Sequence, residues 1–287
     1  MGDGWVIAIA SGKGGTGKTT VATNLAKIYA GQGRAVQYLD CDAEEPNGHI
    51  FLKPRIERRE EVTVDVPEVD EAKCTACGEC GKICQYSAIV CIQDQVLTFE
   101  PLCHSCGGCW LVCPADAIKR KPLRIGEIET GAAGEVGFVS GRLEIGTVRT
   151  PSLIGSVKQH IGPDGIAILD VPPGTSCPVV TALRGVDFVV LVTEPTPFGL
   201  NDLKLAVDLA REMGLPFGVV INREGIGNRD VEIYCQAEKI DIIARLPDDR
   251  RIAEAYSSGD MIVDALPEYE GKFLELHKRI DERIAVQ

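Results

Sequence analysis

The sequence has few aromatic residues, no excess of basic charge and no long apolar run. Aromatics make up 5% of its 287 residues, and acidic side chains outnumber basic ones to give a net charge of −12. This balance argues against a chain that binds nucleic acid by neutralising phosphates and stacking on bases. No apolar stretch reaches the roughly 18 residues that cross a bilayer, and no secretory pattern opens the chain. We therefore expect a cytoplasmic protein that binds neither nucleic acid nor membrane.

What the sequence does contain is an alternation of short apolar runs and helical patterns. Residues 5–10 are typical of a buried strand, and residues 18–30 of a helix that follows it. Further strands are expected at residues 35–40, 165–171, 188–193, 217–221 and 240–246. Helical patterns, notably residues 200–213, separate most of them. This order predicts an α/β fold with a mostly parallel, doubly wound sheet.

A glycine-rich loop follows the first expected strand and opens the first expected helix. Residues 12–19 read GKGGTGKT, which is the spacing of a phosphate-binding P-loop in the context that such a loop requires. Glycines let main-chain N–H groups turn toward an anion, and the helix N-terminus adds partial positive charge. The pattern predicts an ATP site in which Lys18 reaches the β- and γ-phosphates and the Thr19 hydroxyl binds Mg²⁺. The expected nucleotide contacts are Gly12, Gly14, Gly15, Thr16, Gly17, Lys18, Thr19 and Thr20.

Acidic residues end two of the expected strands. Asp170 closes the run 166–170, which is the form expected of a carboxylate on the magnesium side of a P-loop site. Asp40 ends the second strand, and Asp42 lies two residues further on. The alternative to a functional role is that both residues only cap the strand end.

The loop sequence with its additional Lys13 resembles that of the MinD, Mrp and nitrogenase iron-protein family. The resemblance covers about residues 4–52 and 135–265. It implies an ATP-hydrolysing homodimer, or a heterodimer with a similar chain, in which Lys13 crosses the interface and stabilises charge on the partner's nucleotide. It further implies that Asp42 orients the attacking water and that Asp40 helps hold the magnesium shell.

The same resemblance assigns a second switch and an adenine site. Residues 172–175 read PPGT and match the segment that changes its path with the γ-phosphate. Asn222, after an apolar strand, matches an adenine-contacting asparagine, and Pro247 and Asp248 lie where a loop closes over the base.

Eight of the twelve cysteines form two regularly spaced runs that repeat with a shift of 29 residues. The runs are Cys74, Cys77, Cys80 and Cys84, and then Cys103, Cys106, Cys109 and Cys113. Ala88-Ile89 and Ala117-Ile118 repeat with the same shift, so we interpret the segment as two copies of one half-unit. Dense cysteine in a chain without a secretory pattern favours metal ligation over disulfides.

The spacing of each run is that of a [4Fe–4S] ligand set, in which the fourth cysteine of a run binds the other cluster. Cys74, Cys77, Cys80 and Cys113 would then hold one cluster, and Cys103, Cys106, Cys109 and Cys84 the second. Zinc is the alternative, but it favours two separated pairs of ligands. The segment resembles a bacterial two-cluster ferredoxin, with Gln85 where that pattern has proline.

These patterns predict three segments. Residues 1–61 and 123–287 form the two parts of a P-loop ATPase domain, and residues 62–122 form an inserted ferredoxin-like domain of α+β type. We expect residues 126–145 to form a loop or hairpin that leads back into the ATPase domain. Cys41 is a candidate for core packing or for a redox or cluster role. The resemblance to the iron-protein family makes Cys177, otherwise a plain loop cysteine, a candidate ligand of a further cluster at a dimer interface.

Three functions follow from the whole chain. The first is an ATP-gated electron carrier with an unidentified redox partner. The second is an Mrp-type carrier or assembly factor that delivers clusters to an apo-metalloprotein. The third is a MinD-like positioning protein, which the non-basic C-terminal helix disfavours because such a protein needs a membrane anchor.

Overall fold

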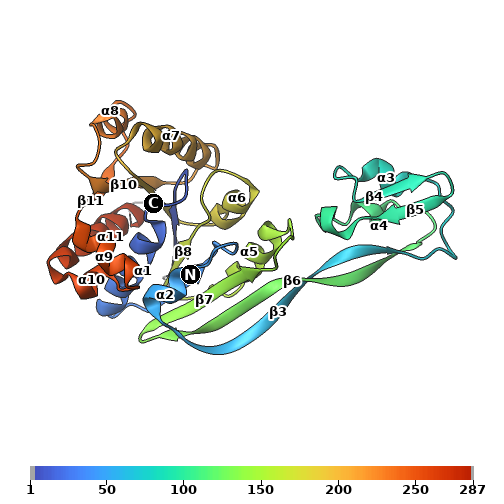
Figure 1. Ribbon diagram of the computed structural model, residues 1–287, viewed down its shortest axis with the longest axis horizontal. Helices are drawn as coiled ribbons and strands as arrows, with labels where there is room; N and C mark the ends of the chain where they lie inside the picture. The colour runs from blue at the N-terminus through green and yellow to red at the C-terminus, as the bar shows by residue number, and fades with distance from the viewer. Residues whose placement is uncertain (1–3, 286–287) are drawn as a thin grey trace.

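The computed structural model describes residues 4–285 and contains a single nine-stranded sheet with a small separate hairpin (Figure 1). The order of the sheet is β11-β10-β9-β1-β8-β2-β7-β6-β3, and all pairs from β11 to β7 are parallel. The strands of the sheet are β1 (Trp5–Ala10), β2 (Val36–Asp40), β3 (Arg55–Val69), β6 (Ile118–Ala133), β7 (Val136–Leu143), β8 (Ile166–Asp170), β9 (Phe188–Thr193), β10 (Phe217–Glu224) and β11 (Ile242–Pro247). The expected mostly parallel α/β sheet is confirmed.

Helices cover both faces of this sheet. One face packs against α5 (Thr150–Lys158), α6 (Cys177–Leu183), α7 (Pro197–Glu212) and α8 (Asp230–Ala237). The other packs against α1 (Lys18–Gly31), α2 (Gly48–Leu52), α9 (Arg250–Ser257), α10 (Ile262–Ala265) and α11 (Glu270–Ile284). The parallel strands are apolar on both faces because each face is buried. Within residues 4–285, no helix is both long and apolar enough to cross a membrane.

Strands β3 and β6 extend beyond the sheet as a two-stranded antiparallel ribbon, shown at the right of Figure 1. Its far end carries a small lobe with α3 (Glu79–Ile83), β4 (Ile89–Ile92), β5 (Gln95–Thr98), the 3₁₀ helix η1 (Glu100–Leu102) and α4 (Gly108–Leu111). We call residues 67–120 the cysteine lobe and the remainder the body. The predicted domain boundaries at residues 62 and 122 fall inside β3 and β6, so the two parts share continuous strands.

The expected hairpin at residues 126–145 is confirmed, because β6 and β7 pair antiparallel from Gly126 opposite Leu143 to Ala133 opposite Val136. Strand β3 has no counterpart among the strands predicted from sequence. Its residues 58–61 are all charged, and their pairing is supported by cross-strand contacts such as Arg59 Nε to Glu129 Oε1 at 2.7 Å.

Candidate functional sites

The predicted nucleotide residues gather at the carboxyl edge of the parallel strands. The glycine-rich loop follows β1, Asp40 ends β2, Asp170 ends β8, and Asn222 lies near the end of β10. Ligands of open α/β sheets bind at this edge, because the loops there leave a crevice between neighbouring strands. The fold therefore brings together side chains that lie up to about 200 residues apart in sequence.

The glycine-rich loop wraps the start of α1. Gly17 precedes the helix with φ 95°, and a Cβ there would lie 2.4 Å from the Asn222 Nδ2 atom, so only glycine fits. Lys18 is 6% exposed, and the first-turn N–H groups of α1 point toward the loop, as at any helix start. The Thr16 hydroxyl is buried and has no hydrogen-bond partner in the described part of the chain. The loop is therefore formed as a compact anion cradle.

Asp170 presents one free carboxylate oxygen beside this cradle. Its Oδ2 accepts a hydrogen bond from the Tyr38 hydroxyl at 2.9 Å, while its buried Oδ1 has no partner among the described residues. Burial raises the pKa of Asp170, whereas the neighbouring Thr19 hydroxyl and the Lys18 charge lower it. An unpartnered carboxylate oxygen next to a threonine hydroxyl fits the oxygen ligands and bound waters of Mg²⁺.

Asp40 lies beside Asp170 on the neighbouring strand, but main-chain groups occupy its oxygens. Its Oδ2 accepts from the Gly48 N–H at 2.9 Å, and its Oδ1 accepts from the Asp42 N–H at 3.2 Å. Burial, followed by the charge of Asp170, raises the pKa of Asp40. In this structure Asp40 therefore fixes the loop 41–48, and it does not direct a free oxygen at the glycine-rich loop.

Asp42 is half-buried where this loop begins. Burial raises its pKa to about 6, and the Lys18 charge acts in the opposite direction. A carboxylate with a pKa near neutrality and close to the P-loop lysine is suited to accept a hydrogen bond from a water molecule.

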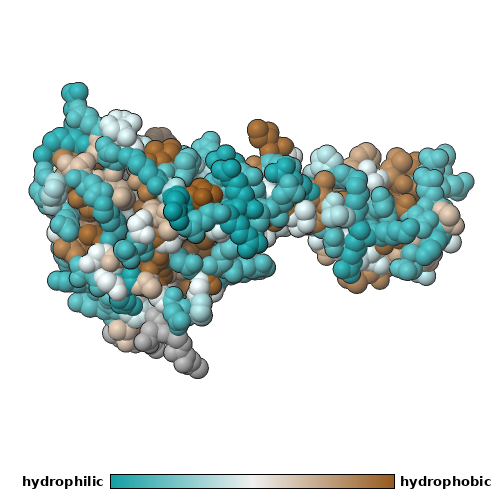
Figure 2. Space-filling model, turned by 90° about the horizontal axis from the view of Figure 1, so that it is seen from below, coloured by the Kyte–Doolittle hydropathy of each residue, from teal (hydrophilic) through white to brown (hydrophobic). Residues whose placement is uncertain are grey.

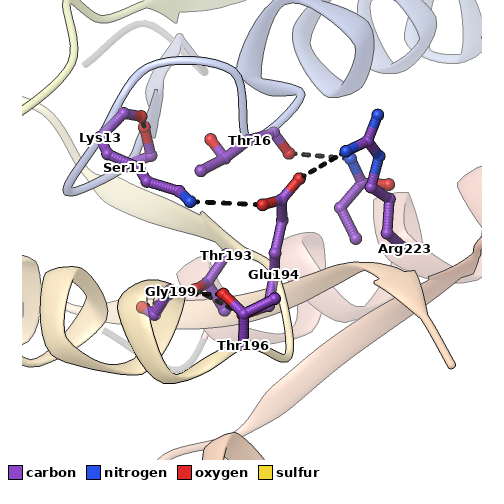
Figure 3. Close-up of polar contacts among 9 residues, drawn as sticks. Ser11, Lys13, Thr16, Thr193, Glu194, Thr196, Gly199 and Arg223 are labelled. Atoms are coloured by element: carbon purple, nitrogen blue, oxygen red, sulfur yellow. Dashed lines mark hydrogen bonds and ion pairs between the residues drawn. The ribbon is translucent and has the colours of Figure 1, made fainter. Parts of the chain in front are cut away.

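Lys13 is held within its own chain (Figure 3). Its Nζ lies 3.4 Å from Glu194 Oε2, and the other carboxylate oxygen of Glu194 lies 3.2 Å from Arg223 Nη1. Glu194 directly follows β9 and is 7% exposed. The glutamate thus bridges two cations across the edge of the sheet.

The residues expected near adenine lie on the adjoining strand ends. Asn222 Nδ2 donates to the Thr16 carbonyl at 2.8 Å, which braces the loop, and Pro247 ends β11 opposite Glu224. The Asp248 N–H donates to the Glu224 carbonyl at 3.0 Å.

The cysteine lobe contains two cavities lined by cysteine side chains. Cys74, Cys77, Cys80 and Cys113 line the first. Cys84, Cys103, Cys106 and Cys109 line the second. Each cavity thus combines three cysteines of one run with the last cysteine of the other, which is the grouping that the spacing predicts.

Main-chain N–H groups point at several of these sulfur atoms. The N–H groups of Ala88, Ser105 and Ala117 lie 3.3 Å from the Sγ atoms of Cys84, Cys103 and Cys113, respectively. Burial tends to raise the pKa of Cys84, but N–H groups around it lower it overall. The repeated Ala-Ile pair places the same N–H donor four residues after the last cysteine of each run, so the sequence repeat is also a structural one.

Within residues 4–285, no three His, Cys, Asp or Glu side chains stand close enough to hold a metal ion. A single zinc ion draws thiolates to about 2.3 Å from itself, whereas a four-iron cube separates its ligands more widely. An assignment of clusters therefore depends on the cavities and on the cysteine spacing.

Four residues of functional interest escape motif-based reasoning. Glu194 forms an ion pair with Lys13, and Tyr38 donates a hydrogen bond to Asp170. Arg149 connects the body to the lobe, and Thr150 donates a hydrogen bond to Glu44. Of these four, only Glu194 could have been found from the sequence, since it directly follows an apolar strand whose carboxyl end was expected at the nucleotide site.

Fold and loop together define the body as an α/β nucleotide-binding domain of the P-loop class. The sequence matches the profile of the CobQ/CobB/MinD/ParA nucleotide binding domain family over residues 7–262, and the chain belongs to this family.

Relatives extend over nearly the whole chain. An uncharacterized protein of Methanocaldococcus jannaschii is 30% identical over 97% of both chains. An iron-sulfur cluster carrier protein of Pyrococcus horikoshii is 28% identical over 90% of this chain and 78% of its own length. The septum site-determining protein MinD of Pyrococcus horikoshii, solved with Mg-ADP, has the same fold, with a TM-score of 0.62 and 22% identity over 99% of this chain and 98% of its own.

Proposed function

We propose that the protein is an ATPase whose nucleotide cycle acts on two resident [4Fe–4S] clusters. The single observation that carries the proposal is the pair of four-cysteine cavities on a ribbon that continues the sheet of a P-loop domain. A cysteine-rich surface loop would have no reason to divide its cysteines into two sets that cross between repeats.

At the nucleotide, Lys18 would bind the β- and γ-phosphates, while Thr19 and Asp170 would hold Mg²⁺, which supplies charge neutralisation. The Asp42 carboxylate would accept a hydrogen bond from the attacking water. A bond forms between the water oxygen and the γ-phosphorus, the bond to the β–γ bridging oxygen breaks, and the proton leaves with the phosphate. The unpartnered Asp170 oxygen and the buried Lys18 support these roles.

Lys13 would act after dimerisation with a second copy or a similar chain. Glu194 holds it in the single chain, so release from this ion pair would let Lys13 reach the partner's nucleotide. The adenine would contact Asn222, Pro247 and Asp248.

The cysteine lobe would hold one cluster on Cys74, Cys77, Cys80 and Cys113, and a second on Cys84, Cys103, Cys106 and Cys109. When bound, the clusters would each take one electron from a low-potential donor and give it to an acceptor protein. The cavities and the N–H groups directed at sulfur support this role, because such hydrogen bonds stabilise thiolate ligands.

Delivery of clusters to an apo-metalloprotein is the second candidate, and the comparisons favour it over electron transfer. The relative from Pyrococcus horikoshii, which covers 90% of this chain, is named an iron-sulfur cluster carrier protein. A carrier must release its cargo, and Cys177 is exposed next to the second switch. The lobe geometry favours resident clusters instead, because each four-cysteine set is complete within the chain.

Anaerobic iron counting with an apo-ferredoxin acceptor separates the two functions. Electron transfer predicts about eight irons per chain that stay bound during ATP turnover. A Cys177→Ser variant should then keep the same count. Iron that moves to the acceptor in an ATP- and Cys177-dependent way would establish the carrier function and overturn the first proposal.

A further inference from the structure

A buried arginine connects the body to the cysteine lobe. Arg149 precedes α5 and is 3% exposed. Its guanidinium donates from Nη2 to the main-chain carbonyl of Glu100 in the lobe, and from Nη1 to the Thr147 hydroxyl at 3.2 Å. We propose that Arg149 transmits the state of the nucleotide-side loop, residues 42–47, to the cysteine set around Cys103.

On the lobe side, Arg149 binds the carbonyl that also holds a predicted cluster ligand. The Cys103 N–H donates to the same Glu100 carbonyl at 3.1 Å. The Cys103 sulfur in turn accepts from the Ser105 N–H at 3.3 Å. A displacement of Glu100 would therefore alter the main-chain hydrogen bond to Cys103 sulfur, and such bonds help to set the reduction potential of a cluster.

On the body side, α5 begins against the loop that carries Asp42. Thr150 Oγ1 donates to Glu44 Oε1 at 2.9 Å, and the Leu143 N–H donates to the Ala43 carbonyl at 2.9 Å. Leu153 and Val157 anchor α5 in the core, so the helix start and Arg149 respond to this loop as one rigid unit.

The arginine contact would be costly to replace. It is charge-assisted and buried, and the Arg149 Nε atom has no partner within residues 4–285. Truncation would leave the Glu100 carbonyl without its charged donor in a site where the arginine is almost fully buried.

The contact is also selective for one cysteine set. The first cavity is lined by residues such as Val69, Cys74 and Ala117 and does not include the segment 99–105 that contains Glu100. Nucleotide should therefore influence the Cys103 set and leave the Cys74 set unaffected. This inference rests on the proposed nucleotide–cluster coupling and adds the route and the cluster concerned.

Hydrogen exchange of the iron-loaded full chain tests the route. With Mg·ATP in place of Mg·ADP, wild-type segment 99–105 should change its exchange rate roughly twofold or more. Arg149→Ala should abolish this change, and Arg149→Lys should keep part of it because a cation still reaches the carbonyl. Thr150→Val should weaken the change from the body side. Arg124→Ala is the matched control, since Arg124 is 44% exposed and, among residues 4–285, pairs only with Glu61, Glu127 and Glu144.

A redox titration monitored by paramagnetic resonance supplies the second readout. The nucleotide-dependent shift should occur in one cluster and disappear in Arg149→Ala while iron content and ATP turnover persist. A shift that survives in Arg149→Ala, or one confined to the Cys74 set, would overturn the relay alone. A wild type that binds ATP with no shift in either cluster, and no change in exchange at segment 99–105, would overturn both the relay and the coupling proposed above.

Discussion

In the body, apolar side chains from helices cover both faces of the sheet, whereas the cysteine lobe holds only two small apolar clusters. Each of these two clusters includes cysteine side chains. The lobe also leaves large apolar side chains in solvent (Figure 2). Leu111, for example, is 79% exposed. A unit of this size buries too little apolar surface to fold on that basis alone. Burial thus stabilises the body, whereas we expect the lobe to depend on the clusters proposed for its cysteines.

Removal of iron should have the largest effect and should separate the two regions. A chelator under reducing conditions should leave the body folded and able to bind ATP, while cleavage within residues 67–120 accelerates about tenfold or more. Limited proteolysis with mass spectrometry measures this, and the untreated protein is the control. If the lobe resists proteolysis equally well without iron, its stability does not depend on clusters and does not differ in origin from that of the body.

Loss of the P-loop lysine should affect only the body. Lys18→Ala should lower ATP turnover by about 100-fold or more and abolish nucleotide-dependent dimerisation, because a buried cation next to the phosphates is lost. Iron content should not change. Lys27→Ala, in the same helix but ion-paired with Asp264, serves as the control. Normal turnover in Lys18→Ala would show that the nucleotide site lies elsewhere.

A single cysteine substitution should affect only the lobe. Cys80→Ser should remove about half of the iron and leave ATP binding intact, because Cys80 lines only the first cavity. Cys91→Ser is the control, since Cys91 lines neither cavity. Paramagnetic resonance after reduction should show one cluster signal lost, and an unchanged spectrum would refute the ligand assignment.

The pH dependence of ATP turnover should reflect Asp42. Burial raises the pKa of Asp42 to about 6, so its carboxylate forms as the pH increases through this value. Below pH 6, the rate of ATP turnover should therefore rise by about tenfold per pH unit. Asp42→Asn should be slow at every pH. The folded pKa also exceeds the usual 3.8, so this group contributes stability at low pH that is lost as the pH rises through about 6.

The asparagine variant should accordingly raise the melting temperature more at pH 7.5 than at pH 4.5. Calorimetry at both values checks the sign. A larger gain at pH 4.5, or a flat wild-type rate profile, would mean that Asp42 titrates elsewhere or does not participate.

Release of Lys13 should produce the smallest change. Glu194→Gln removes the ion pairs of Glu194 with Lys13 and Arg223, and the freed Lys13 should tighten nucleotide-dependent dimerisation by about two- to fivefold. Sedimentation with Mg·ATP measures the dimer, with Glu238→Gln, which loses an exposed pair to Arg211, as the control. Weaker dimerisation would mean that Glu194 supports the assembled state.

The parallel strands of the body could be predicted because burial on both faces makes them continuous apolar runs. Strand β3 could not, since its charged residues are held by pairing with β6 and not by burial. The positions of the glycine-rich loop and Asp170 follow from strand order. The use of Asp40 by two main-chain N–H groups, and the contact of Arg149 with Glu100, have no sequence pattern, because each depends on how distant segments meet.

We propose above that the nucleotide bound to the body alters a cluster in the lobe. A redox titration of the wild-type, iron-loaded protein by paramagnetic resonance, with Mg·ADP and with a non-hydrolysable Mg·ATP analogue, tests it directly. We expect the midpoint potential of one cluster to differ between the two nucleotides and that of the other cluster to stay the same. Two superimposable titrations for both clusters, with nucleotide binding verified, would contradict it.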